Sequence, residues 1–275
     1  MQSSSPSDAA VIGGQHRARK RFGQHFLADR TYIARSVDAI DPQREDRMVE
    51  VGPGLGALTK PLLDRVNLLH VIEIDRDIVA RLATQFVHDR LVVHAGDALE
   101  FDFSALGTSL RIVGNLPYNI SSPLLFRIAD YSADVLDCHF MLQKEVVNRM
   151  AAPPGSKTYG RLSVMIQYRF AVEKLFDVPA GAFNPAPKVE SAFVRLQPHR
   201  LLPVTASDEQ LLGAVVAGAF SQRRKTVRNA MSAFASAEQL AALGIDPGVR
   251  PENLSVADFV RVANALAERT DRPAD

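Results

Sequence analysis

The sequence predicts an α/β fold with a mostly parallel sheet, followed by a small helical domain. Between about residues 31 and 150, short apolar runs alternate with segments whose apolar residues recur at helical spacing. This alternation is typical of a parallel sheet covered by helices on both faces. After residue 200 the strand pattern ends, and Ala and Leu recur at helical spacing up to the C-terminus. These two observations together predict the two-part architecture.

The elements of the first part follow in a regular order. The apolar runs predict strands at 47–52, 68–75, 90–97, 110–115 and 137–143. The amphipathic segments predict helices at 31–40, 57–66, 76–86, 122–131 and 144–150. A further strand pair, 168–179 and 191–198, is separated by a proline-rich connection. Because antiparallel strands often border a parallel sheet, this pair is expected at the edge of the sheet.

Three segments divide the chain. Residues 1–15 are small and polar and predict a disordered tail, because such a segment buries too little apolar surface to fold. Residues 16–200 are expected to form the α/β domain, and 201–275 the helical one. In the latter, the periodicity predicts helices over 209–231, 236–244 and 255–269.

Composition limits the class of protein. The 275 residues are 47% hydrophobic and 23% charged with a net charge of +1, as in ordinary globular proteins. The single cysteine, Cys138, allows neither an internal disulfide nor a cluster of thiolate metal ligands. Neither a secretory signal nor a membrane-spanning run is evident, so no membrane contact is expected and the predicted location is the cytoplasm.

A glycine-rich loop follows the first predicted strand of the sheet. Gly52, Gly54 and Gly56 lie within "VEVGPGLGALT", before a helix. Glycines at such a position allow a tight turn and a close approach of the backbone to a ligand. Gly52, Gly54 and Ala57 also fit the dinucleotide pattern G-x-G-x-x-A. The alternative is a plain strand-to-helix turn.

Acidic residues end the next two predicted strands. Glu73 can accept both hydroxyls of a ribose, which nicotinamide dinucleotides and S-adenosylmethionine both carry. Asp97 can accept from the exocyclic amino group of adenine. The competing interpretations are a surface acid for Glu73 and a helix N-cap for Asp97.

The fourth strand ends in an unusual tetrapeptide, Asn115-Leu116-Pro117-Tyr118. Ligands of open parallel sheets bind at the carboxyl ends of strands, so this tetrapeptide is expected beside the cofactor. The Asn115 side-chain oxygen and the Leu116 carbonyl can each accept one N–H of an amino group conjugated to a ring. Pro117 stiffens the turn, and Tyr118 offers a face on which an extruded base can stack. A strand-ending turn with a core tyrosine is the alternative.

Together these segments resemble a known family, the small-subunit ribosomal RNA adenine dimethyltransferases. The resemblance extends from about residue 20 to 265. It is carried by "KRFGQHFL", "VEVGPGLGALT", "EIDRD", "AGDAL", "GNLPYNIS" and "FNPAPKVESAFVRL". It implies a Rossmann-like class I methyltransferase sheet, mostly parallel with an antiparallel edge strand, and a small all-helical C-terminal domain.

The resemblance also implies roles for individual residues. His25 and Leu27 would line a site for S-adenosyl-L-methionine, Gly52 would pass close to its methionine part, and Gly54 would belong to the same site. Glu73 would hold the ribose and Asp97 the adenine, while Asn115 would bridge cofactor and target. Phe183 would sandwich the target base opposite Tyr118; without the family, it reads equally well as a core anchor. No metal is implied.

The implied substrate is 16S ribosomal RNA within a 30S precursor. Two adjacent adenosines of a hairpin loop near its 3′ end would each receive two methyl groups, in the course of rRNA processing and ribosome biogenesis. A monomer is expected.

Two basic segments suit an RNA substrate. Arg17, Lys20 and Arg21 belong to one, and Arg223, Arg224, Lys225 and Arg228 to the other. Each could neutralise phosphates, although either could equally be a solvated charged face. At helical spacing, Arg224 and Arg228 are expected to share one face of a helix.

Other functions compete with this one. A 23S ribosomal RNA dimethyltransferase or a DNA adenine methylase would use similar motifs. A non-catalytic RNA-binding assembly or transcription factor could use the same fold. A nicotinamide oxidoreductase would explain the glycines and Glu73, but it leaves Asn115, Pro117 and Tyr118 without a role.

Overall fold

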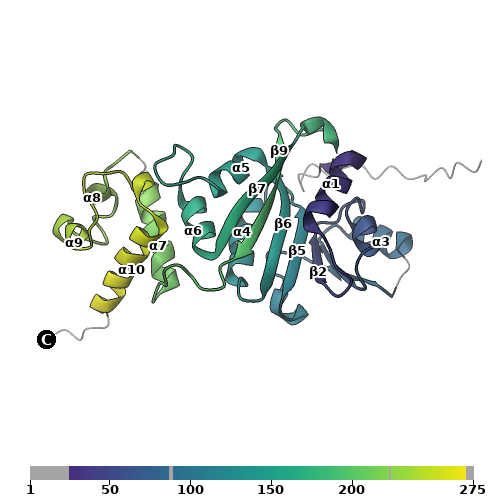
Figure 1. Ribbon diagram of the computed structural model, residues 1–275, viewed down its shortest axis with the longest axis horizontal. Helices are drawn as coiled ribbons and strands as arrows, with labels where there is room; N and C mark the ends of the chain where they lie inside the picture. The colour runs from purple at the N-terminus through teal and green to yellow at the C-terminus, as the bar shows by residue number, and fades with distance from the viewer. Residues whose placement is uncertain (1–24, 87–88, 223, 271–275) are drawn as a thin grey trace, which may run out of the picture.

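A computed structural model describes residues 25–86, 89–222 and 224–270 of the chain. Its centre is a seven-stranded sheet with the order β4-β3-β2-β5-β6-β9-β7 (Figure 1). The strands are β2 (Arg47–Val51), β3 (Leu69–Glu73), β4 (Leu91–Ala95), β5 (Leu110–Asn115), β6 (Val135–Gln143), β7 (Phe170–Val178) and β9 (Ser191–Pro198). All seven strands that the apolar runs predict are therefore present.

The first five strands of the sheet are parallel, as expected. The chain moves outward from β2 through β3 to β4, then returns to place β5 on the other side of β2. The connections that leave the carboxyl ends of β2 and β5 therefore run in opposite directions, which makes this a topological switch point. In open α/β sheets, this is where a crevice for ligands forms.

The antiparallel part differs in detail from the expectation. β9 is the antiparallel strand, and it lies between β6 and β7, so that β7 is the edge. The predicted strand 168–179 also begins two residues early, because α6 (Arg161–Arg169) continues up to Phe170. The apolar residues around this boundary fit both the period of a helix and the period of a strand, so periodicity alone does not locate the boundary.

Helices cover both faces of the sheet. One face is packed against α1 (Arg30–Ile40), α2 (Thr59–Leu63) and α3 (Arg76–Gln85). The other is packed against α4 (Ser121–Asp130), α5 (Lys144–Met150) and α6. Successive residues of β2 alternate between these layers: Met48 packs in the first, and Val49 and Val51 in the second. The strand periodicity in the sequence therefore corresponds to two buried layers.

The C-terminal part contains helices and no strand among its described residues. They are α7 (Glu209–Ser221), α8 (Val227–Ala230), α9 (Ala237–Ala242) and α10 (Val256–Thr270), with short 3-10 turns such as Pro251–Asn253. Figure 1 shows them at one end of the molecule, beside α6. Their buried side chains form one cluster, which also includes Val164 and Tyr168 of α6. This helical unit therefore shares its core with the last helix of the α/β part.

The predicted helix over 209–231 is wrong in one respect, because the chain leaves helical geometry between α7 and α8. From Gln222 to Thr226 the sequence supplies no apolar side chain for the core. The helix resumes after Thr226, where the Val227 N–H donates to the Val249 carbonyl at 2.7 Å. A tertiary hydrogen bond thus replaces the continuing helical ladder.

A two-stranded sheet was not anticipated from the sequence. β1 (Phe26–Leu27) pairs with β8 (Phe183–Asn184), which joins segments more than 150 residues apart. This pairing brings the start of the described chain to the carboxyl edge of the main sheet. Of the helices in the described ranges, none combines the length and the apolar character that a bilayer crossing requires.

Candidate functional site

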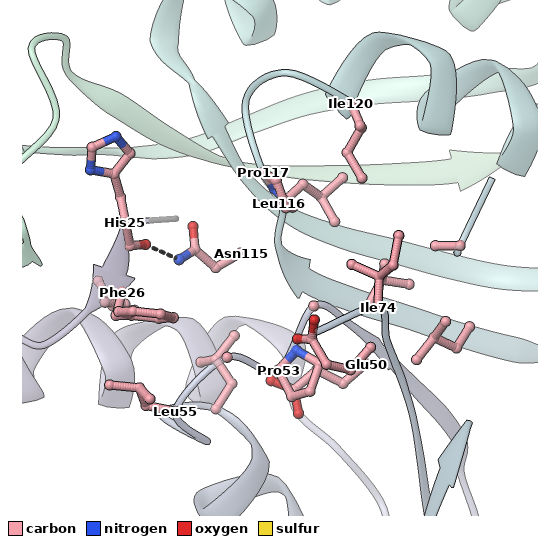
Figure 2. A pocket seen from close by; sticks show the side chains of 18 of the residues that line it. His25, Phe26, Glu50, Pro53, Leu55, Ile74, Asn115, Leu116, Pro117 and Ile120 are labelled. Atoms are coloured by element: carbon pink, nitrogen blue, oxygen red, sulfur yellow. Dashed lines mark hydrogen bonds between the residues drawn. The ribbon is translucent and has the colours of Figure 1, made fainter. Parts of the chain in front are cut away.

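A pocket opens at the carboxyl ends of β2, β3, β4 and β5 (Figure 2). It contains nearly every residue that the sequence singled out for a cofactor. Its lining includes His25, Leu27, Gly52, Gly54, Glu73, Asp97, Asn115, Leu116, Pro117 and Tyr118. It also includes residues that were not anticipated, notably Phe26, Glu50 and Ile74. The expected gathering of strand ends around one pocket is therefore present.

The glycine loop forms the floor of the pocket between β2 and α2. Gly54 has a φ of +55°, and a Cβ added there would lie 2.8 Å from the Phe26 ring. Gly52 has a φ of +68°, and its N–H donates to the Ile72 carbonyl at 3.0 Å. Both positions favour glycine because of their positive φ, and Gly54 also needs it because Phe26 of β1 approaches so closely. The loop is thus more specialised than a plain strand-to-helix turn.

Glu73 is held at the end of β3 by the start of the next helix. Its Oε1 accepts from the Asp75 N–H at 2.9 Å, and Asp75 in turn is the N-cap of α3. Glu73 is 6% exposed, and this burial raises its pKa. The carboxyl group is therefore oriented before any ligand binds. This arrangement argues against the interpretation of Glu73 as a freely solvated surface acid.

Asp97 follows β4 and already makes one local hydrogen bond. Its Oδ1 accepts from the Leu99 N–H at 2.9 Å. This is the local turn bond that an aspartate makes to the backbone two residues onward. The carboxylate has further acceptor capacity, and the residue lines the pocket. A local backbone role and a role towards a ligand are therefore compatible.

The Asn115 side chain is oriented by the segment before β1. Its Nδ2 donates to the His25 carbonyl at 2.8 Å, as the dashed line in Figure 2 marks. The amide oxygen is then the side-chain atom available to accept a hydrogen bond. Leu116 is 1% exposed, and its N–H donates to the Met141 carbonyl at 3.1 Å. The backbone around the tetrapeptide is therefore tied to β6.

Tyr118 is held at both its hydroxyl group and its ring. The hydroxyl lies 2.6 Å from the Oγ of Ser191. The ring stacks on the His25 imidazole, with centroids 5.5 Å apart and planes 29° from parallel. Burial raises the pKa of Tyr118, so the phenol stays protonated near neutral pH. The imidazole is itself fixed, because His25 Nδ1 donates to the Pro185 carbonyl at 2.8 Å.

Phe183 lies away from the pocket lining. It belongs to β8, is 4% exposed and packs in the core layer that also contains Leu27 and Phe193. This is the core-anchor interpretation that the residue alone supported equally well. A stacking role would require the ring to leave this layer, and it stays a prediction.

Glu50 is a site residue that the sequence analysis missed. It is 1% exposed, and the Thr59 hydroxyl donates to its Oε2 at 2.7 Å. Its pKa is raised to about 7, chiefly by burial and in smaller part by the nearby Glu73, while the hydrogen bond from Thr59 opposes this shift. The available signal was a single acid inside the apolar strand "RMVEVG", since an ionisable residue is rarely buried without a reason.

The basic segments are only partly described. Arg17, Lys20, Arg21 and Arg223 lie outside the described residues. Arg224 and Lys225 are exposed in the turn between α7 and α8, and Arg228 is exposed on α8. The expectation that Arg224 and Arg228 share a face of one helix is wrong, because the helix is interrupted between them. None of these three lines the pocket.

Comparison with known proteins identifies relatives along nearly the whole chain. A family model described as ribosomal RNA adenine dimethylase matches residues 15–268. A curated relative from Aromatoleum aromaticum, named ribosomal RNA small subunit methyltransferase A, is 57% identical over 258 residues. These are 94% of this chain and 97% of that protein. A protein of the same name from Dechloromonas aromatica is 56% identical, over 92% of this chain and 99% of that one.

Solved structures establish the same fold at lower identity. A dimethyladenosine transferase from Plasmodium falciparum has a TM-score of 0.74 and 24% identity, over 90% of this chain and 98% of its own. The 23S rRNA methyltransferase ErmE has a TM-score of 0.70 and 23% identity, over 88% and 99%. At this identity the likeness concerns the fold: an α/β methyltransferase sheet with a helical C-terminal part.

Proposed function

We propose that small-subunit ribosomal RNA is the substrate of this chain, which belongs to the ribosomal RNA adenine dimethylase family. The protein transfers methyl groups from S-adenosylmethionine to the exocyclic amino group of two adjacent adenosines. These adenosines lie in the hairpin loop near the 3′ end of 16S ribosomal RNA. The names and identities of the curated relatives support the choice of RNA. The observation that carries the proposal is the oriented amide of Asn115 beside a pocket of strand-end acids and glycines.

The pocket suits S-adenosylmethionine. Glu73 is oriented to accept from ribose hydroxyls, and Asp97 retains acceptor capacity for an adenine amino group. Ile74 lines the pocket and is 48% exposed, an apolar surface that a purine ring would cover. Gly52 and Gly54 keep the floor free of side chains where the methionine part passes. His25 and Leu27, from the segment at and just before β1, also line the pocket.

The residues of the tetrapeptide orient the target amino group. The cofactor supplies a methyl group on a positively charged sulfur, with a neutral thioether as leaving group. The Asn115 Oδ1 and the Leu116 carbonyl each accept one N–H of the adenine amino group. These contacts hold the nitrogen in place and favour its pyramidal form, in which the lone pair is available. Tyr118 stacks on the extruded base. Catalysis is then mainly orientation and electrostatics.

The same geometry accommodates a second methyl group. The first transfer leaves a positively charged nitrogen, which releases one proton to solvent. The nitrogen then keeps one N–H for one of the two acceptors, and the methyl group takes the place of the other hydrogen. Dimethylation then requires a pocket that tolerates this first methyl. A monomer that acts in the cytoplasm on a 30S precursor, in the course of ribosome biogenesis, belongs to the same proposal.

The exposed cations of the helical part are the proposed contacts to RNA phosphates. Arg224, Lys225 and Arg228 supply these contacts among the described residues. Arg17, Lys20, Arg21 and Arg223, which lie outside the described residues, belong to the same proposal. Replacing Arg224 and Lys225 by Glu should weaken binding to the particle and reduce its salt dependence. The affinity for S-adenosylmethionine should stay unchanged. An unaltered salt slope would contradict this part of the proposal.

The deciding experiment uses 30S particles from cells that lack the activity. The purified protein and radiolabelled S-adenosylmethionine are added, and methylated adenosines are mapped by mass spectrometry. Asn115→Ala is the test variant. Asn67→Ala is the matched control, because Asn67 is exposed and its side-chain amide hydrogen-bonds only to Glu45 within the described ranges. We expect dimethyladenosine at two adjacent positions near the 16S 3′ end, lost in Asn115→Ala and kept in Asn67→Ala.

Two other outcomes would redirect the proposal. Label on 23S RNA or DNA, with none on the 30S particle, would keep the chemistry and overturn the substrate. Measurable cofactor binding without transfer to any nucleic acid would favour an RNA-binding assembly factor on the same fold.

A further inference from the structure

Ser191 contacts the proposed stacking residue from a distant part of the chain. Its Oγ lies 2.6 Å from the Tyr118 hydroxyl, although 73 residues separate them. Ser191 is fully buried at the first position of β9. There it pairs with Gln143 of β6 on one side and Val178 of β7 on the other. The hydroxyl that meets Tyr118 therefore comes from the middle strand of a three-stranded unit.

The residue before Ser191 is anchored as well. The Lys144 N–H donates to the Glu190 carbonyl at 3.0 Å, directly beyond the end of β6. The Lys144 Nζ lies 2.7 Å from the Glu190 carboxylate and 3.0 Å from that of Asp177. Exposed ion pairs contribute little stability by themselves, so the backbone bond is the main restraint. Together these contacts fix the backbone at the point where Ser191 begins its strand.

Tyr118, by contrast, lies on the connection between β5 and α4. The ring of a tyrosine on such a connection can turn about two side-chain torsions unless other groups hold it. Ser191 holds it at the hydroxyl, and the His25 imidazole covers one face. The ring is half-buried, so a base must stack on the surface that His25 leaves open. The hydroxyl contact therefore sets the plane on which the base rests.

We propose that Ser191 is a positioning residue for methyl transfer: its hydroxyl holds the Tyr118 ring at the angle that presents the target adenine to Asn115. The inference rests on the proposed function, because it takes Tyr118 as the stacking surface. Methyl transfer demands close alignment of the attacking nitrogen, so a tilted base reacts slowly even when it is bound. Ser191 thus acts through Tyr118 and touches neither substrate nor cofactor.

The expected signature is a loss of turnover with binding retained. A neutral hydrogen bond contributes enough to change a rate by about 3- to 10-fold. Ser191→Ala should therefore lower kcat on 30S particles by about 3- to 10-fold. The KM for the particle and the Kd for S-adenosylmethionine should stay within about twofold of wild type, since Ser191 aligns the bound base and contacts neither ligand. Ser232→Ala is the matched control, an exposed serine bonded only to the local Asn229 carbonyl by its hydroxyl.

A double-mutant cycle separates positioning from general structural support. Tyr118→Phe removes the same hydrogen bond from the other side and leaves the core around Ser191 intact. If Ser191 acts through this bond, both single variants lose a similar factor, and the double variant loses no more than either one. Tyr118→Phe also keeps the inference testable should Ser191→Ala fold poorly, because its own loss of kcat must then match the predicted range.

The outcomes are distinct. Non-additive losses confined to kcat support the inference. The inference is overturned if the kcat losses of the two single variants multiply in the double variant, or if Ser191→Ala has wild-type kcat. Either result leaves the proposed function in place. Absence of methyl transfer by the wild-type protein to any RNA overturns the proposed function and this inference with it.

Discussion

Replacing Glu50 by Gln should remove a pH dependence of stability. Glu50 is buried in β2, two residues before Gly52, with one oxygen bonded to the Thr59 hydroxyl and Glu73 as a charged neighbour that raises its pKa. Burial disfavours the ionised carboxylate and raises the pKa of Glu50 from 4.5 to about 7 in the folded protein. Gln keeps the size and the acceptor for Thr59, but it cannot ionise.

The sign and size follow from linkage. Because the folded state binds this proton more tightly than the unfolded state, Glu50 contributes stability that is fully present below pH 4.5. That contribution is lost as the pH rises through about 7. Each tenfold change in proton affinity corresponds to about 1.4 kcal/mol, so the whole loss is roughly 3 kcal/mol. Most of it, about 2–3 kcal/mol, falls between pH 5 and 8.

Denaturant unfolding at pH 5, 6, 7 and 8 measures this effect. The free energy of unfolding of wild type minus that of Glu50→Gln should fall by about 2–3 kcal/mol across the series. Taking the difference removes contributions that the two proteins share and isolates the pH dependence that the Glu50 carboxyl group introduces. Parallel pH profiles for the two proteins would refute the reasoning, because they would mean that Glu50 titrates alike in the folded and unfolded states.

Three further predictions concern other parts of the molecule. Arg111→Ala should lower the free energy of unfolding by roughly 3–5 kcal/mol in denaturant titrations, because it removes the guanidinium group paired with the buried carboxylate of Asp137 and leaves only the His139 ring, 3.6 Å away, beside it among the described residues. A loss below about 1 kcal/mol would show that this ion pair is dispensable. Gly54→Ala should weaken S-adenosylmethionine binding at least about tenfold by calorimetry, since the new Cβ would meet the Phe26 ring at 2.8 Å. Unchanged affinity would mean that the loop adapts. Asn115→Asp should lower kcat as much as Asn115→Ala, because a carboxylate cannot donate the N–H that orients this side chain. A variant with Asp that retains activity would argue against the proposed orientation.

Some of the fold could be read from local patterns. Strand and helix segments differ in the period of their apolar residues, and β2 and α1 each show one period clearly. The boundary between α6 and β7 does not show one period clearly, because the apolar residues there fit both the helix period and the strand period. The break after α7 was also missed, because the bond from Val227 to Val249 that replaces the helix lies outside any local window.

The candidate site shows the same division. Glycines and acids at consecutive strand ends predicted that Gly52, Glu73, Asp97 and Asn115 would meet in one pocket, and they do. Parallel strands make this possible, because their carboxyl ends share one edge of the sheet. The sequence by itself therefore determined the order of the elements and the chemistry placed at their ends.

Tertiary structure alone decided which distant side chains meet. Two contacts join segments that are far apart in the chain: the pairing of β1 with β8 and the contact of Ser191 with Tyr118. The core position of Phe183 likewise depends on its tertiary neighbours. The burial that raises the pKa of Glu50 is of the same kind. Such contacts depend on how whole layers pack, because a side chain takes its environment from every element around it, whereas a sequence pattern reports only on the element to which it belongs.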